Sequence, residues 1–104
     1  MIVVKVTYTV NPGFVQQNME NIKSFMSDFK KMDTGIFNYV SYLCEDGRTF
    51  VHLSHYKNEH IQKQLLQVPS FLSFQKQRDD SGLEGLPEIE VMNVAASSHD
   101  FFDS

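Results

Sequence analysis

The dipeptide Asp46-Gly47 separates two segments rich in β-branched and aromatic residues, 36–45 and 48–56. Asp-Gly between two such segments is a strong signal for a β-hairpin, because this pair readily adopts the left-handed backbone of a two-residue turn. If these two residues form the turn, Glu45 pairs with Arg48. The pairing of every later residue in the hairpin then follows.

This register divides the hairpin side chains between two faces, because successive residues of a strand point to opposite sides. One face carries Phe37, Tyr39, Ser41, Leu43, Phe50, His52, Ser54 and Tyr56. The other face carries Ile36, Val40, Tyr42, Val51, Leu53 and His55. Apolar residues therefore occur on both faces, so a sheet with helices on one side needs a second cover. The sequence predicts a homodimer that packs sheet to sheet.

The remaining segments predict two more strands and two helical regions. Residues 2–10 are rich in β-branched types and predict a first strand, whereas the last strand is expected over 88–96. Between the first strand and the hairpin, a stripe at helical spacing predicts a helix that stops near Gly35. That stripe consists of Val15, Met19, Ile22, Phe25, Met26 and Phe29. A second helical region, broken by Pro69, carries Ile61, Leu65, Val68, Phe71, Phe74 and Arg78.

The order β-α-β-β-α-β is the ferredoxin-like arrangement, an α+β fold with helices on one face of an antiparallel sheet. The length of 104 residues indicates one domain, expected over residues 1–96, followed by a polar C-terminal tail at 97–104. Cys44 is the only cysteine, and no apolar run approaches the ~20 residues of a membrane span. A cytoplasmic protein without a membrane partner is expected.

The order and spacing of these segments resemble the antibiotic biosynthesis monooxygenase-like family of the dimeric α+β barrel group, over residues 2–94. The matching pieces are Asn11-Pro12-Gly13, the amphipathic helix, Asp46-Gly47, Tyr56-Lys57-Asn58-Glu59, Pro69-Ser70-Phe71 and Leu86-Pro87-Glu88-Ile89. The resemblance implies a dimeric barrel with a small apolar pocket in each subunit. Members include cofactor-free oxygenases of polyketide-type aromatics, haem-degrading enzymes and proteins without an assigned activity.

At individual residues the chain departs from parts of this family. Haem-degrading members resemble the chain near Pro69, but their haem-ligating histidine aligns with Gln75 and their first-strand asparagine falls near Val6. No haem, and no other cofactor, is therefore expected. Tyr56 stands where family members often carry a tryptophan that lines the pocket.

The histidines of the hairpin do not predict a metal site. His52 and His55 are three residues apart on a strand, so their side chains point to opposite faces. His55 and His60 have no visible third ligand, and no metal-binding spacing such as HExxH occurs.

His52 is the candidate catalytic base, because it shares a face with Tyr39 and Tyr56. A cofactor-free oxygenase needs a base in an apolar cavity and a donor for the developing oxyanion, and Tyr39 or Tyr56 is the candidate donor. The expected substrate-binding residues are Phe37, Ser41, Phe50, Ser54 and Arg78. The simpler alternative is that His52 only bonds Ser41 across the strands.

The expected function is a cofactor-independent monooxygenase acting on a small aromatic or quinone-like substrate. The alternative is a non-catalytic homodimer that binds a small hydrophobic metabolite. Binding of nucleic acid is not expected, because the net charge is −4 and the basic residues are scattered. The segment 48–53 resembles the third-strand motif of RNA-recognition domains only in part, since it lacks the basic-glycine-aromatic start.

Overall fold

The computed structural model describes residues 1–102 of the chain, and Asp103 and Ser104 of the predicted tail lie outside the described residues. The strands are β1 (Ile2–Thr9), β2 (Phe37–Leu43), β3 (Thr49–Tyr56) and β4 (Glu88–Met92). The helices are α1 (Val15–Phe29), α2 (Glu59–Leu66) and α3 (Pro69–Gln77), with shorter helical turns at Pro12–Phe14 and Arg78–Gly82.

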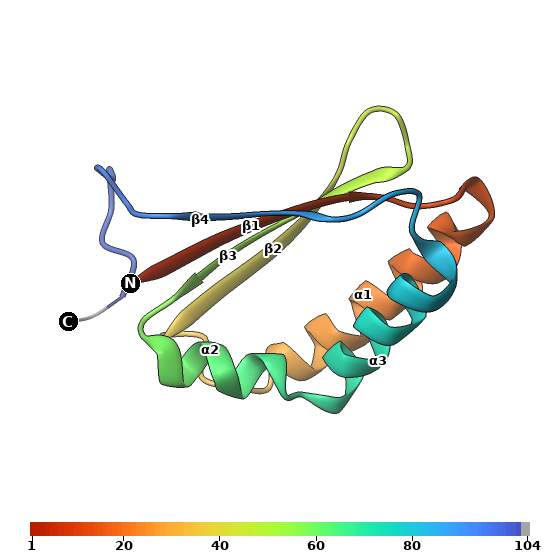
Figure 1. The fold of residues 1–104 in the computed structure, drawn as a ribbon. Coiled ribbons are helices and arrows are strands. Elements are labelled where there is room, and N and C mark those ends of the chain that lie inside the picture. Colours follow the sequence, from red (N-terminus) through yellow and green to blue (C-terminus); the bar gives the residue numbers. More distant parts are fainter. Residues whose placement is uncertain (103–104) are drawn as a thin grey trace.

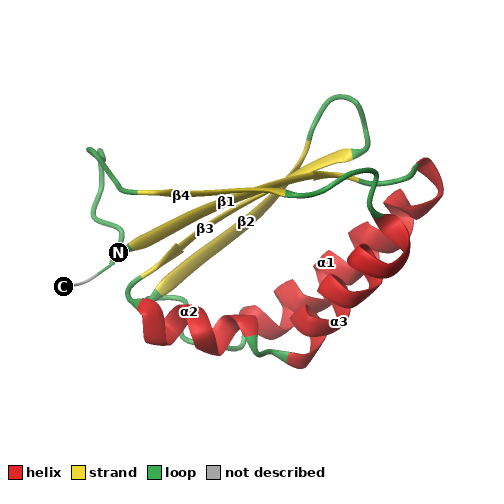
Figure 2. Ribbon diagram, in the orientation of Figure 1, coloured by secondary structure: helices red, strands yellow, loops and turns green. Residues whose placement is uncertain are grey.

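The four strands form one sheet in the order β2-β3-β1-β4, and each neighbouring pair is antiparallel. The helices lie on one face of this sheet, where α1 and α3 run side by side (Figure 1). Figure 2 shows the resulting two layers, helical on one side and β on the other. The predicted ferredoxin-like α+β architecture is confirmed. No helix within residues 1–102 is long and apolar enough to cross a membrane.

The predicted hairpin register is confirmed along the strands, from Phe37 opposite Tyr56 to Leu43 opposite Phe50. The predicted two-residue turn is wrong, because the strands end before Glu45 and Arg48 can pair. The chain reverses through residues 44–48, and the Gly47 N–H donates to the Cys44 carbonyl at 3.0 Å. The Asp46 carboxylate explains the longer loop, since it accepts hydrogen bonds from the backbone N–H groups of Arg48 and Thr49.

Two predicted element ends also differ from the structure. Helix α1 ends at Phe29, and Gly35, whose N–H donates to Asp33 Oδ1, does not adopt the left-handed conformation expected of it. Strand β4 ends at Met92 rather than near residue 96, because Met92 already pairs with Val3 and β1 begins only one residue earlier.

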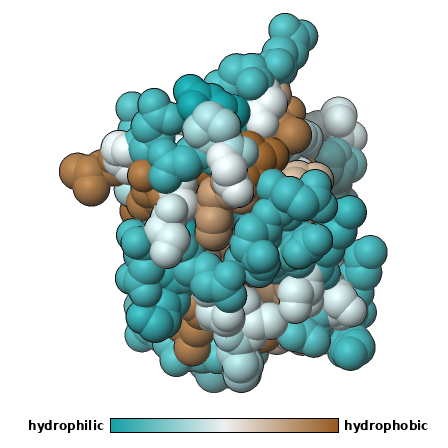
Figure 3. Space-filling view, turned by 90° about the vertical axis from the view of Figure 1, so that its right-hand side faces the viewer, coloured by the Kyte–Doolittle hydropathy of each residue, from teal (hydrophilic) through white to brown (hydrophobic). Residues whose placement is uncertain are grey.

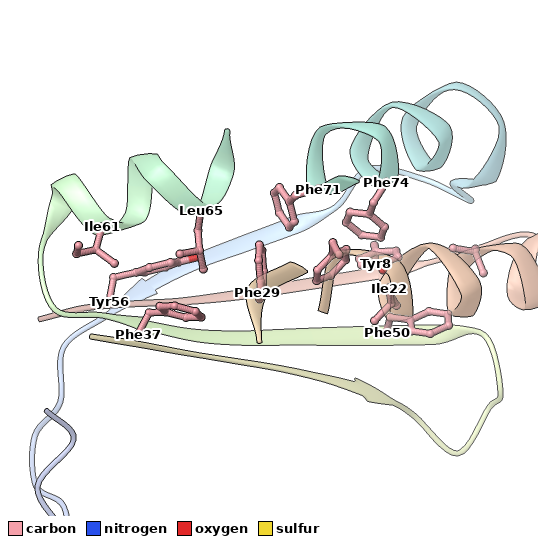
Figure 4. Close-up of a cluster of buried hydrophobic side chains, with 12 residues drawn as sticks. Tyr8, Ile22, Phe29, Phe37, Phe50, Tyr56, Ile61, Leu65, Phe71 and Phe74 are labelled. Carbon is pink, nitrogen blue, oxygen red and sulfur yellow. The ribbon is translucent and has the colours of Figure 1, made fainter. Parts of the chain in front are cut away.

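The core between sheet and helices is built mainly from aromatic rings (Figure 4). Phe25 of α1 packs edge-on against Phe71 and Phe74 of α3, with ring centres 5.1 and 4.9 Å apart. Phe29 packs in the same way against Phe37 of β2, at 6.0 Å. Offset and edge-on ring pairs of this kind add about 0.5–1.5 kcal/mol each beyond the burial of their area. Aromatic packing therefore fixes the distance between helices and sheet.

We expect Gly82→Ala to destabilise the protein by about 1–3 kcal/mol, because a β-carbon at this buried position would overlap the ring of Phe14. Gly13→Ala is the matched control, since a β-carbon there meets nothing within 4 Å. Urea unfolding of both variants measures the difference. Equal stabilities for the two variants would contradict this account of the packing between Phe14 and the Arg78–Gly82 turn.

Candidate functional site

A cavity of about 320 Å³ opens between the C-terminal part of α1 and the edge strand β2. Its walls are formed by Met26, Phe29, Lys30, Thr34, Phe37, Asn38, Tyr39, Phe101 and Phe102. Five of these nine residues carry aromatic rings, and Lys30, Thr34 and Asn38 add polar groups. The volume is that of a small-molecule pocket.

The C-terminal segment supplies two of the pocket's aromatic rings, Phe101 and Phe102. Phe101 also stacks on His55 of β3, with ring centres 4.5 Å apart and planes at 18°. His55 lies on the sheet face away from the helices, next to Val3, which is buried although no helix covers it. The tail thus covers one end of the open face and reaches the pocket at the edge of β2.

Behind the pocket wall lies a chain of four hydrogen-bonded side chains. Tyr39 Oη lies 2.7 Å from His52 Nδ1, and His52 Nε2 lies 2.8 Å from Tyr8 Oη. Asn18 Nδ2 donates to Tyr8 Oη at 3.0 Å. Only Tyr39 belongs to the pocket wall, whereas His52, Tyr8 and Asn18 are almost completely buried. We call these four residues the hydrogen-bond chain.

The sheet register brings the two tyrosines to the histidine. His52 stands directly opposite Ser41 on β2 and Val6 on β1. Tyr39 and Tyr8 each lie two residues from these positions, on the same face, so both are diagonal neighbours of His52. Long side chains reach such diagonal partners.

Burial governs the protonation of the chain. Burial, and then the charge of Arg78, lower the pKa of His52 from 6.5 to about 3, so its imidazole is neutral at pH 7. Burial also raises the pKa of Tyr39 and of Tyr8 well above 10, so both hydroxyls keep their hydrogens. The chain therefore consists of neutral groups whose hydrogens are shared along it.

Arg78 lies behind the hydrogen-bond chain and not in the pocket wall. Its guanidinium carbon is 5.1 Å from the centre of the Tyr8 ring and 5.3 Å from that of Phe74. Its side chain is only 11% exposed, and Nε donates to Asp79 at 2.9 Å. The predicted contact of Arg78 with a substrate does not match this position, because Arg78 is not part of the pocket wall.

The structure brings some predicted site residues to the pocket and leaves others in the core. Phe37 and Tyr39 line the pocket. Five others lie elsewhere on the helix-facing side of the hairpin, namely Ser41, Phe50, His52, Ser54 and Tyr56. The alternative bond from His52 to Ser41 is wrong, because Tyr39 and Tyr8 occupy both ring nitrogens of His52. Ser54 instead donates to the Val4 carbonyl at 3.3 Å.

Sequence reasoning missed Tyr8, Asn18 and the two tail phenylalanines. Tyr8 gave one signal, as the only aromatic residue of a strand otherwise rich in β-branched types. Asn18 gave another, because it lies one helical turn before Ile22 within the apolar stripe of α1. A polar residue at a core position needs a buried partner, and Tyr8 is that partner.

Nothing in residues 1–102 forms a group of three or more histidine, cysteine, aspartate or glutamate side chains that could hold a metal ion.

Comparison with known proteins supports the fold. No protein-family model and no curated protein sequence matches the chain. A solved structure described as an antibiotic biosynthesis monooxygenase is 8% identical with a TM-score of 0.78, and the match covers 92% of this chain and 100% of the other. A conserved protein from Methanosarcina mazei is 23% identical, with a TM-score of 0.74 and coverage of 88% and 89%.

A protein from Mycobacterium tuberculosis is 15% identical, with a TM-score of 0.79 and coverage of 94% and 98%. At such low identities, these matches show a shared backbone fold. The predicted resemblance to antibiotic biosynthesis monooxygenase-like proteins is confirmed at the level of fold.

The low pKa of His52 predicts that the free energy of unfolding falls as the pH is lowered from about 6.5 toward about 3. In that range the unfolded chain binds a proton that the buried imidazole does not, which gives a slope of up to about 1.4 kcal/mol per pH unit. His52→Gln should remove the contribution of His52 to the slope of the free energy of unfolding against pH, whatever the substitution does to stability at pH 7. Urea unfolding at several pH values between 4 and 7 measures this slope.

His60→Gln is the control for this experiment, because it removes an exposed imidazole from the start of α2. His55 contributes to the remaining slope, since burial and the nearby His99 lower its pKa. An unchanged slope in His52→Gln would contradict the neutral, buried state of His52.

Proposed function

We propose that the pocket binds a small aromatic or quinone-like molecule and that the protein is a cofactor-independent monooxygenase. The observation that carries this proposal is Tyr39, a residue of the pocket wall whose hydroxyl is hydrogen-bonded to a neutral His52. The likeness in fold to a structure described as an antibiotic biosynthesis monooxygenase adds support.

The pocket fits the binding step of such a reaction. The rings of Phe29, Phe37 and the two tail phenylalanines offer aromatic surface to a flat substrate. A substrate oxygen placed at Tyr39 would then receive a hydrogen bond within an apolar surrounding, where such a bond is stronger than in water. In this position Tyr39 would act as the hydrogen-bond donor to an oxyanion.

In the reaction, an activated CH₂ group next to a carbonyl loses a proton and becomes an enolate. The enolate reacts with O₂, so that one oxygen atom enters the substrate as a new carbonyl and the other leaves as water. Tyr39 can serve this reaction by donating its hydrogen to the enolate oxygen, while both hydrogens of the CH₂ group end in the water that leaves.

A non-catalytic binding protein is the second candidate, and one observation favours it. Both ring nitrogens of His52 are already hydrogen-bonded, and its pKa of about 3 makes it a weak base at pH 7. The same pocket would then only hold a small hydrophobic metabolite.

Oxygen uptake with anthrone- or quinol-type substrates tests the activity. We expect Tyr39→Phe to lower turnover by about 10²-fold, the usual cost of removing one oxyanion donor. Tyr42→Phe is the matched control, because Tyr42 is 51% exposed on the sheet face away from the helices. Uptake that persists in both Tyr39→Phe and His52→Ala would show that the site is misassigned. Absence of uptake, with aromatic ligands still raising the melting temperature, would favour the binding protein.

We also infer that the protein is a homodimer assembled through its sheet. Val40 and Tyr42 are exposed on the face of β2 away from the helices, whereas Ile89 and Val91, 70% and 72% exposed, lie on the other face of the edge strand β4. Ile36, expected on the open face, instead packs against the core. Figure 3 shows that one end of the molecule is largely hydrophilic, with hydrophobic side chains between and beside the polar ones. A second copy of the chain would cover the exposed strands.

Sedimentation equilibrium tests this assembly. We expect a mass of twice 12.0 kDa at micromolar concentration. Val91→Lys should shift the protein toward the monomer, because it places a charge on the exposed edge strand. Lys23→Glu changes an exposed position of α1 and should leave the dimer intact. A monomeric wild-type protein would refute the assembly.

A further inference from the structure

The hydrogen-bond chain has a direction, because each of its hydroxyl groups and the neutral imidazole owns one hydrogen. If one member's hydrogen is fixed, the positions of the others follow. The two possible directions give Tyr39 opposite roles in the pocket, either as a donor or as an acceptor. The group that fixes the direction therefore sets the chemistry offered to a ligand.

Asn18 sits at the buried end of the chain, and its amide N–H donates to Tyr8 Oη at 3.0 Å. The Tyr8 hydrogen then points to His52 Nε2, 2.8 Å away, which must act as the acceptor. A neutral imidazole that accepts at Nε2 carries its hydrogen on Nδ1. Nδ1 therefore donates to Tyr39 Oη at 2.7 Å.

The last hydrogen in this sequence is that of Tyr39 itself. Among residues 1–102, Tyr39 Oη makes one hydrogen bond, the one to His52, and Tyr39 is part of the pocket wall. In this direction the chain leaves one donor unused, the hydroxyl of Tyr39.

The opposite direction requires the Asn18 amide to turn over. Tyr8 would then donate to Asn18 Oδ1, His52 would carry its hydrogen on Nε2, and Tyr39 would donate to Nδ1. In the observed orientation Asn18 Oδ1 is buried without a partner. After the amide has turned over, the whole NH₂ group would be buried without a hydrogen-bond partner. A buried carbonyl without a partner is better tolerated than orphaned N–H groups, so the observed orientation is favoured.

Arg78 supports the neutral imidazole that this sequence needs. Its guanidinium lies over the Tyr8 ring, and its charge disfavours a second proton on His52. The other groups around the imidazole are the rings of Phe25, Phe74, Tyr8 and Tyr39, none of which carries a negative charge. His52 thus has no counter-ion that would stabilise an imidazolium.

We propose that Asn18 is a positioning residue that sets the direction of the hydrogen-bond chain, so that His52 carries its hydrogen on Nδ1 and Tyr39 donates to a carbonyl or phenolate oxygen bound in the pocket. The ligand half of this proposal rests on the proposed function of the pocket. On this proposal the pocket selects ligands that carry an oxygen acceptor. Tyr39, rather than His52, is then the group that touches the ligand.

The tautomer of His52 can be read directly from the ¹⁵N chemical shifts of its ring in the free protein. The expected result for the wild type is the Nδ1–H form. Asn18→Leu removes the donor that orients Tyr8, and the Nδ1–H form should lose its dominance. Asn21→Leu makes the same change at a less buried position of α1 and should leave the tautomer unchanged.

A dominant Nε2–H form in the wild type would overturn the proposal. So would an Asn18→Leu protein that folds and keeps the wild-type tautomer. If Asn18→Leu does not fold, the wild-type spectrum alone decides the direction of the chain. A purely structural Asn18 would affect stability without moving the ring hydrogen, so the spectrum separates the two roles.

Binding of 9-fluorenone and fluorene, two flat molecules that differ in one carbonyl oxygen, tests the ligand half. We expect the wild type to bind fluorenone about fivefold more tightly, the effect of one net hydrogen bond. Tyr39→Phe should abolish this preference, and Asn18→Leu should reduce it. Equal binding of both molecules by the wild type would refute the donor role of Tyr39. If neither binds, the proposed pocket function fails, and the tautomer still decides the role of Asn18.

Discussion

The pairing of a buried imidazole constrains much of this structure. His52 lies among aromatic rings, where an unpaired ring nitrogen would cost about 1–3 kcal/mol. Its two partners come from two different strands, Tyr39 from β2 and Tyr8 from β1. Asn18 then connects the chain to α1. The hydrogen bonds that start from His52 thus connect the three neighbouring strands β1, β2 and β3 with helix α1.

The faces of the hairpin could be predicted because they follow from a local rule. Once Asp46-Gly47 marks the reversal, the strand period of two places Tyr39 and His52 on one face. The turn itself could not be predicted, since Asp-Gly is compatible with a two-residue turn and with a longer loop. The Asp46 carboxylate selects the longer loop by accepting two backbone N–H groups, while the strand pairing stays the same.

The rest of the candidate site depends on contacts between segments far apart in the sequence. Tyr8 meets His52 only because β1 lies between β3 and β4, an order that the ferredoxin-like topology fixes but hairpin periodicity does not. Asn18 was recognisable as a polar residue in an apolar stripe, yet its partner depends on how α1 docks. Phe101 reaches the pocket through its contact with His55, which no periodic pattern in the polar tail indicates.

The hydrogen-bond chain also explains why a protein would keep polar groups inside an aromatic core. Replacing them by apolar residues of similar shape would cost little stability, so stability alone does not account for the network. Only Tyr39 belongs both to the chain and to the pocket wall. A hydroxyl whose hydrogen is already directed by buried partners needs no reorientation when a ligand oxygen arrives. Under the proposed function, that preorganisation would stabilise developing charge as fixed dipoles do, and it would begin at a single amide on α1.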